Sequence, residues 1–303
     1  MEKNKSIHIA VLIVPLLLLG CARSENKAWP NVILTSGVFA EEGSEYISIY
    51  NPNSREAALT GEYPASNISI LKDDKLVGRF LAGEEVLATY DLKNHELQII
   101  EHLDVIRKQL ESTEDWERYP AEELTVKGPV QMSEDETRVY FILGYTLCQY
   151  NVGEKRVSVI DRLYSETVLL REAKNELLYL KSGDLIAYNL MDATQQKYNI
   201  NAQKFTAGLD GDDIYYLEKD SESINYFSRS QNKIRKLFQL NQSHTEMHMS
   251  SDGSCLLYSK RKGSLVDSTG DREVYLYRIS SGSRIKVFDS KTDGNKWRYV
   301  TVE

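Results

Sequence analysis

The sequence predicts an all-β protein built from one four-stranded unit that is repeated six times. One phrase recurs six times: a short strand ending in an aromatic residue, a polar turn, and a second strand. The aligned aromatic residues are spaced by 40, 60, 38, 39 and 50 residues, and about 40 residues hold four short strands with their turns. Residues alternate with a period of two in the strands, and the turns are rich in Asn, Asp, Gly and Ser. Radial repetition of such a unit is a β-propeller, so one six-bladed propeller is expected over residues 31–303, with seven blades as the alternative.

The six copies of the phrase give the last two strands of each expected blade. They cover residues 46–59, 86–100, 146–160, 185–200, 224–238 and 274–288, with the aromatic residues Tyr50, Tyr90, Tyr150, Tyr188, Phe227 and Tyr277. A β-sandwich is the competing architecture, but it gives no reason for one aromatic phrase to return after 38 or 39 residues. A further apolar run, Trp297 to Val302, follows the last copy. We expect it to pair beside Val32–Thr35 and close the ring.

Residues 1–20 read as a cleavable leader. Lys3 and Lys5 precede an uncharged apolar run, Ile9 to Leu19, whose eleven residues are too few to cross about 30 Å of hydrocarbon. The run ends in Leu18-Leu19-Gly20-Cys21, which resembles the lipobox of bacterial lipoproteins. The resemblance implies cleavage before Cys21 and acylation of that cysteine with fatty acids such as palmitate. An ordinary secretory leader is the alternative.

The resemblance also implies a location. Residues 21–30 would form a lipidated polar tether. In Gram-negative lipoproteins, an Asp directly after the lipidated cysteine resembles the signal that retains the protein in the inner membrane. This chain has Ala22 at that position. The absence of this Asp favours the outer membrane as the location. The resemblance thus implies a lipid-anchored protein of the bacterial cell envelope. Two or more acyl chains give lasting attachment to a bilayer.

Charge and cysteine usage exclude some classes of partner and bond. The chain has 37 Lys and Arg against 45 Asp and Glu, a formal charge of −8, so it would repel a nucleic acid backbone. Cys148 and Cys255 fall in the third and sixth expected blades, on opposite sides of the disc. A disulfide needs Cα atoms within about 7 Å, so we expect two separate buried thiols.

Two turn phrases carry a second resemblance. Residues 249–259 (MSSDGSCLLYS) and 132–143 (MSEDETRVYFIL) resemble the Ser-x-Asp-Gly turn of TolB-like and peptidase-type propellers. The second phrase departs from that pattern, because Glu136 stands in the Gly position. The resemblance implies a propeller of that kind over the body of the chain.

Two of the repeat spacings are too long, which locates insertions at 103–126 and 260–273. The first joins two blades and should contain a short helix with Ile106 and Leu110 on one face; the second separates the second and third strands of the last blade. Both leave the disc on the same face, where binding loops gather on a rigid scaffold. The candidate binding residues on this face are Trp116, Lys260, Arg261 and Lys262. Drift in surface loops is the alternative explanation.

One constellation suggests metal chemistry. Strand alternation places His244, Glu246 and His248 on one face of an expected inner strand, near the channel mouth, where they could hold a divalent transition metal. Hydrogen bonds to neighbouring backbone are the other explanation for these histidines. Asp210, Asp212 and Asp213 fit a hairpin turn better than a calcium loop. We find no G-x-S-x-G elbow, Walker loop or dinucleotide fingerprint, and we assign no catalytic residue.

The sequence therefore predicts a membrane-anchored envelope lipoprotein whose propeller is a non-catalytic module that binds a protein, peptide or glycan. It predicts no cofactor. One alternative is a metal-dependent hydrolase or lactonase with its site at the channel mouth. Another is a peptidase-type propeller that has lost its catalytic partner.

Overall fold

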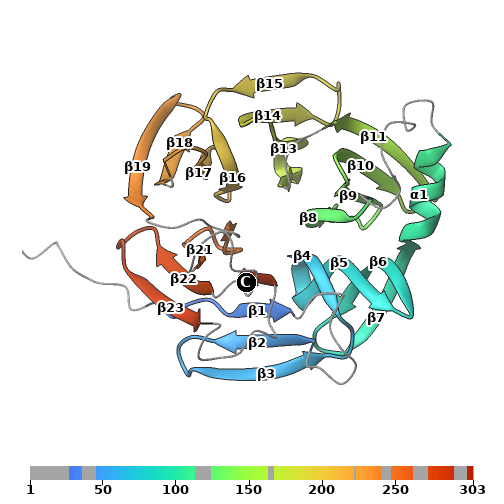
Figure 1. Ribbon diagram of the computed structural model, residues 1–303, viewed down its shortest axis with the longest axis horizontal. Helices are drawn as coiled ribbons and strands as arrows, with labels where there is room; N and C mark the ends of the chain where they lie inside the picture. The colour runs from blue at the N-terminus through green and yellow to red at the C-terminus, as the bar shows by residue number, and fades with distance from the viewer. Residues whose placement is uncertain are drawn as a thin grey trace, which may run out of the picture.

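The computed structural model describes residues 27–35, 46–112, 124–162, 167–221, 223–240, 247–261, 272–289 and 299–302. Within them the chain forms six four-stranded antiparallel sheets around a central axis, as Figure 1 shows. The predicted six-bladed β-propeller is confirmed, and the seven-bladed and β-sandwich alternatives are wrong. No helix in the described ranges is long and apolar enough to cross a membrane.

Five blades each take four consecutive strands, which run in order from the innermost outwards. Blade 2 contains β4 (Ala65–Ile70), β5 (Lys75–Ala82), β6 (Glu84–Asp91) and β7 (Glu96–His102). Blade 3 contains β8 (Val126–Met132), β9 (Arg138–Leu143), β10 (Thr146–Asn151) and β11 (Arg156–Arg162). Blade 4 contains β12 (Val168–Arg171), β13 (Glu176–Lys181), β14 (Asp184–Asn189) and β15 (Gln195–Tyr198). Blade 5 contains β16 (Ala202–Ala207), β17 (Asp213–Glu218), β18 (Ser223–Ser228) and β19 (Lys233–Gln239). Blade 6 contains β20 (Met247–Met249), β21 (Cys255–Arg261), β22 (Arg272–Arg278) and β23 (Arg284–Asp289).

Blade 1 is assembled from both ends of the chain. Its inner strand is β24 (Tyr299–Val302), followed outwards by β1 (Val32–Thr35), β2 (Ile47–Asn51) and β3 (Glu56–Gly61). β24 pairs antiparallel with β1, with Val302 opposite Val32 and Tyr299 opposite Thr35. The expected closure of the ring by the C-terminal run is confirmed.

The repeated aromatic residue holds neighbouring blades together. It lies on the third strand and reaches the outer strand of the preceding blade. The Tyr90 hydroxyl donates to the Thr60 carbonyl at 2.7 Å, and the Tyr150 hydroxyl donates to Glu101 Oε2 at 2.6 Å. In blades 5 and 6 ring contacts replace these hydrogen bonds, with centroids 5.6 Å apart for Phe227–Tyr198 and 4.8 Å apart for Tyr277–Phe238. Each ring buries apolar area between two sheets, which explains why this residue type recurs.

The turn after the aromatic residue has a left-handed residue at the same position in every blade. A left-handed residue stands near the end of each of the six turns: Arg55, His95, Lys155, Ala193, Asn232 and Gly282. An Asn or Asp opens the turn in four blades, and its side chain accepts from backbone N–H groups, as Asp91 does from Lys93 at 2.8 Å and Asn94 at 2.9 Å. The aromatic–Asn or aromatic–Asp pair in the sequence is therefore a strand residue followed by the first residue of the turn.

We expect Ala193→Gly to stabilise the protein. Ala193 is exposed with φ of 60°, a conformation that costs an L-residue about 1–2 kcal/mol and glycine nothing. Glycine's larger entropy in the unfolded chain offsets part of this, leaving a net gain of about 0.5–1 kcal/mol in the free energy of unfolding. Chemical denaturation measures it. Ala57→Gly, at an exposed extended position in β3, is the matched control and should destabilise; the same sign for both variants would contradict the explanation.

The first turn of each blade explains the Ser-x-Asp-Gly phrase. Ser250 Oγ donates to Asp252 Oδ1 at 2.8 Å, Ser254 N donates to the same oxygen at 3.0 Å, and Gly253 has φ of 66°. The 133–137 turn repeats this pattern, with Ser133 Oγ 2.6 Å from Asp135 Oδ1. Glu136 adopts the left-handed φ of 56° that glycine has in the other copy. The departure in sequence therefore changes no geometry.

The carboxylate of this turn should make stability depend on acid pH. Hydrogen bonds from Ser133 and Thr137 lower the pKa of Asp135 to about 2. The unfolded chain has a pKa near its ordinary value of about 3.9, so the unfolded state binds the proton first. The contribution is therefore complete above about pH 4 and is lost as the pH falls towards 2. Unfolding measured between pH 5 and 2 should show a shallower loss of stability in Asp135→Asn; an identical slope would count against this role.

Candidate functional site

The two faces of the disc differ in what they carry. Turns between second and third strands, and the connections between blades, lie on one face, which we call the insertion rim. Turns between first and second strands, and those between third and fourth strands, lie on the other, which we call the turn rim. Both predicted insertions connect at the insertion rim: one follows β7, and the other separates β21 from β22.

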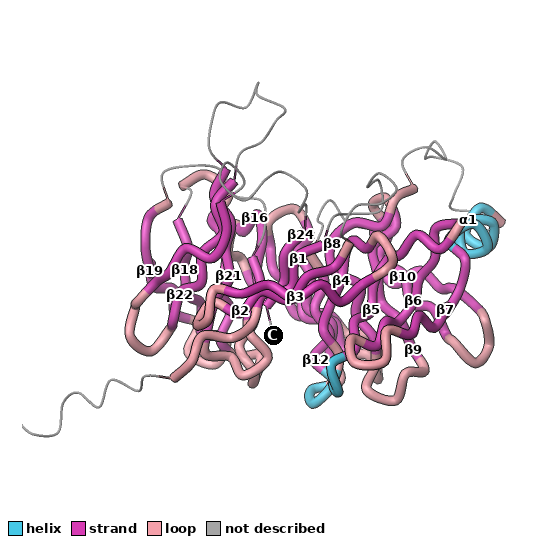
Figure 2. The backbone as a smooth tube through the Cα atoms, turned by 90° about the horizontal axis from the view of Figure 1, so that it is seen from below, coloured by secondary structure: helices cyan, strands magenta, loops and turns pink. Residues whose placement is uncertain are grey.

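The first insertion begins with the expected helix, α1 (Leu103–Glu111), but the helix does not face the central mouth. Leu103, Ile106 and Leu110 are buried in one apolar cluster with residues of blades 2 and 3. Figure 1 shows α1 at the outer edge of the disc, beside β7 and β11. Figure 2 places it near one face, with the short 3-10 turn that follows β12 near the other. The helix therefore seals the boundary between blades 2 and 3 from outside.

Ion pairs fix α1 in that place. Arg107 Nη2 lies 2.9 Å from Glu85 Oε2, and its Nη1 lies 2.7 Å from Asp104 Oδ1. Glu85 also pairs with the buried guanidinium of Arg79. Burial acts to raise the pKa of Glu85, but the hydrogen bonds and charges of Arg107 and Arg79 outweigh it and lower the pKa. These groups satisfy one another, which assigns the helix a structural role.

Of the four residues chosen from the sequence as binding candidates, two are described, one of them in its backbone alone. Trp116 and Lys262 lie outside the described residues. Arg261 ends β21, and only its backbone is described. Lys260 is half-buried, with its ammonium 5.7 Å from the centroid of the Tyr275 ring. This contact between an ammonium and an aromatic ring of the same blade accounts for the position of the Lys260 side chain.

Of the three metal-site candidates, one lies among the described residues. His244 and Glu246 lie outside the described residues, whereas His248 lies on the inner strand β20, opposite Leu257. Burial, with a smaller effect from the charge of Lys204, lowers the pKa of His248 to about 4, so the imidazole is neutral at pH 7. Among the residues that the structure describes, no three His, Cys, Asp or Glu side chains form a group that could hold a metal ion.

The acidic turn at 208–213 is a hairpin turn, as predicted. Asp212 pairs with Lys174 at 2.8 Å, and Asp213 accepts from the Tyr226 hydroxyl at 2.6 Å. Asp210 accepts from the backbone N–H of Asp212 at 3.0 Å. The three carboxylates thus serve three separate partners. Cys148 and Cys255 are buried free thiols, which confirms the expectation for both.

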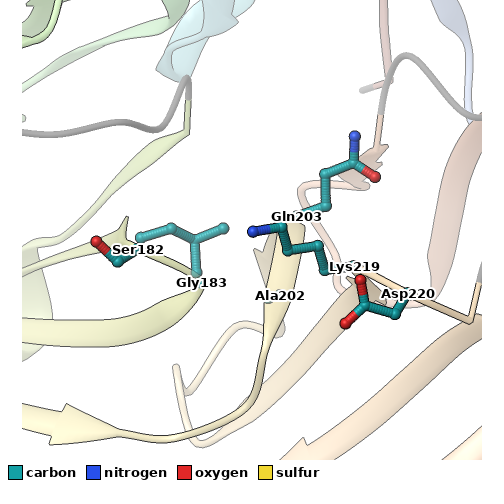
Figure 3. Close-up of a pocket in the computed structure, with 7 residues that line it drawn as sticks. Ser182, Gly183, Ala202, Gln203, Lys219 and Asp220 are labelled. Atoms are coloured by element: carbon teal, nitrogen blue, oxygen red, sulfur yellow. The ribbon is translucent and has the colours of Figure 1, made fainter.

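The insertion rim does carry a pocket, in a place that the sequence reasoning missed. It has a volume of about 410 Å³ and lies between blades 4 and 5 (Figure 3). Its lining residues come from the end of β13 and the turn after it, the start of β16 and the β17–β18 turn: Leu180, Ser182, Gly183, Ala202, Gln203, Lys219 and Asp220. Leu180 and Ala202 are buried apolar residues, whereas Ser182, Gln203, Lys219 and Asp220 are polar residues that reach solvent. In Figure 3 the Lys219 side chain extends across the pocket towards the β13–β14 turn.

The connection between the two blades shapes this pocket. Ala202 N donates to the Gly183 carbonyl at 2.7 Å, and Lys219 N donates to the Asn201 carbonyl at 3.0 Å. Asn201 Nδ2 also donates to Asp220 at 3.1 Å. On the turn rim the same two blades are closed by Arg229–Glu176 at 2.6 Å and Lys174–Asp212 at 2.8 Å. The boundary is thus held shut on one face and opens into a pocket on the other.

Comparisons with known proteins show the fold alone. No protein-family model and no curated protein matches the chain. TolB from Acinetobacter baumannii has a similar structure, with a TM-score of 0.63 and 11% identity over 91% of this chain; the match spans 66% of that TolB. A chain of the nidogen/laminin complex has a TM-score of 0.61 and 9% identity over 90% of this chain and 97% of its own. An oligogalacturonate lyase in complex with manganese has a TM-score of 0.50 and 12% identity over 88% of this chain and 82% of its own. The chain therefore has a TolB-like six-bladed propeller fold, which both binding proteins and enzymes use.

Proposed function

We propose that the protein is a lipid-anchored component of the bacterial envelope whose propeller binds a protein, peptide or glycan through the insertion rim without catalysing a reaction. The observation that carries this proposal is the pocket between blades 4 and 5. It combines two buried apolar lining residues, Leu180 and Ala202, with polar groups on three separate segments. Apolar contact with a few polar groups for orientation is the usual composition of a recognition site.

One further observation supports the lipid anchor, and another supports the binding role. The leader sequence up to Cys21 supports export and acylation. One propeller of similar shape was solved within a protein–protein complex, the nidogen/laminin complex. At 9% identity this similarity concerns shape only, so the partner of the present chain has to be found by experiment.

Site-directed photo-crosslinking in the intact envelope tests the proposal. A photo-reactive residue at Gln203, which lines the pocket, should capture a discrete partner that mass spectrometry identifies. The same residue at Glu154, an exposed turn-rim position in blade 3, is the control and should not capture it. Exchanging the pocket charges, as Lys219→Glu with Asp220→Lys, should abolish capture at Gln203. Equal capture from both positions would contradict the proposal, and so would capture at Gln203 that is unchanged in the charge-exchanged variant.

A second candidate function, a metal-dependent hydrolase or lactonase, is favoured by the similarity to a lyase solved with manganese. It would use His248 together with His244 and Glu246. Elemental analysis of the purified protein decides between the two. One bound transition metal per chain, lost in His248→Ala, would support the enzyme. A metal content well below one per chain would leave the binding role as the better explanation.

A further inference from the structure

The last four residues of the proposed tether are bonded to the turn rim. We call residues 27–30 the N-terminal strap. Trp29 N donates to Asn53 Oδ1 at 2.8 Å, and Asn53 Nδ2 donates to the Trp29 carbonyl at 2.8 Å. Asn53 lies in the β2–β3 turn of blade 1, which belongs to the turn rim. The side-chain amide therefore holds the strap backbone in both directions, as a paired strand would.

Blade 6 holds the other side of the strap. Arg278, at the end of β22, donates from Nη2 to the Lys27 carbonyl at 2.6 Å, and its guanidinium lies 4.2 Å from the centroid of the Trp29 ring. Lys27 pairs with Asp252, the aspartate of the Ser-x-Asp-Gly turn in that blade. Arg278 and Asp252 both stand on the turn-rim side of blade 6, so these strap contacts all lie on one face of the disc.

The length of the remaining tether limits how the disc can stand on a bilayer. Six residue steps separate Cys21 from Lys27, which span at most about 20 Å when fully extended. The seven residues of β22 make six steps as well and rise about 20 Å from one rim towards the other, and the turns at both ends of the strand add to the path that a chain passing around the blade must cover. A lipid on Cys21 therefore keeps the strap near the bilayer, and the tether is too short to pass around blade 6 and lay the insertion rim on the membrane.

From this geometry we propose that the anchored propeller stands with the turn rim of blades 6 and 1 towards the lipid surface, so that the strap turns the insertion rim and its pocket away from the membrane. The proposal rests on the lipid anchor at Cys21 proposed above. The surface that the bilayer faces is then the strap edge, and the pocket between blades 4 and 5 is presented to the surrounding compartment.

A chemically anchored protein tests the orientation directly. Residues 21–303 are coupled through the Cys21 thiol to a maleimide lipid in phosphatidylcholine vesicles; Cys148 and Cys255 are buried and do not compete. A fluorophore is placed, through a non-natural azido residue, at Ser230 on the turn rim or at Gln203 on the insertion rim. Both positions are exposed and flank blade 5, so they form a matched pair. Lipids with nitroxide-labelled headgroups then quench the fluorophore at short range.

We expect quenching at Ser230 to exceed quenching at Gln203 several-fold. Asn53→Ala with Arg278→Ala should release the strap and lengthen the tether to the ten steps between Cys21 and Asn31, about 35 Å, and should at least halve the difference. Equal quenching at the two positions, stronger quenching at Gln203, or a difference that survives release of the strap would each overturn the proposal. Because the lipid is attached chemically, this result is independent of cellular acylation, which the intact mass of the membrane-extracted protein reports separately.

Discussion

Deletion of the last five residues, 299–303, is expected to remove the cooperative unfolding transition of the whole propeller. The deletion takes away β24, whose four residues all pair with β1. It exposes one edge of β1, where Val32, Ile33 and Leu34 are 0%, 0% and 5% accessible, and it removes the buried Val302. Burial of each such side chain contributes about 1.5–3 kcal/mol. Four of them amount to a large part of the roughly 5–15 kcal/mol that stabilises a typical domain.

The reason is topological as well as local. In a closed ring every blade is covered on both faces, so opening the boundary between blades 6 and 1 leaves two sheet faces exposed to water. Circular dichroism and intrinsic fluorescence during urea titration measure the effect. Thr301→Pro, which removes an N–H opposite Ile33, should show the same defect in milder form, and Thr301→Val should fold normally. A truncated chain that unfolds in one transition at the wild-type midpoint would show that β24 does not close the ring.

Repetition made the architecture predictable from the sequence. The aromatic phrase occurs once in each of the six blades, because its aromatic side chain lies at the boundary between two neighbouring sheets, and every blade must form such a boundary. The closure of the ring by β24 and β1 was predictable for the same reason, because one strand-like apolar run remained unassigned at each end of the chain. Weak copies of the first turn were harder to recognise: at Asn175 and Asp74 the left-handed position carries neither Gly nor the Ser-x-Asp phrase.

The candidate site was less accessible to sequence reasoning. Insertions are visible as excess length, but length does not show whether a helix faces a central mouth or seals an outer boundary, and α1 does the second. The pocket arises where three short segments, 16 to 37 residues apart, meet across a blade boundary, as Ser182, Gln203 and Lys219 do. None of them departs from an ordinary turn or strand start in sequence. Such a site becomes visible only when the blades are placed side by side.

The boundary beneath that pocket depends on one buried ion pair. The guanidinium of Arg229 donates to both carboxylate oxygens of Glu176, at 2.6 and 3.0 Å, and to the Gly211 carbonyl at 3.0 Å. The two side chains are 9% and 11% accessible. Arg229 also lies over the Tyr198 ring, with 5.2 Å between Cζ and the ring centroid. Arg229→Ala would leave a carboxylate buried without its partner, so we expect a loss of about 3–5 kcal/mol in the free energy of unfolding.

Pairwise substitution separates the pairing from the cost of an orphaned charge. Glu176→Leu and Arg229→Met should each destabilise strongly, because each single change leaves the other charge buried and unpaired. The double variant should recover most of the loss, since two apolar side chains of similar volume can pack where the ions were. Urea unfolding of the four proteins gives the coupling energy. Additive losses in the double variant would show that the two residues act independently, and the blade 4–5 boundary would then be held by its apolar core, with Leu178, Phe205 and Phe227 at its centre.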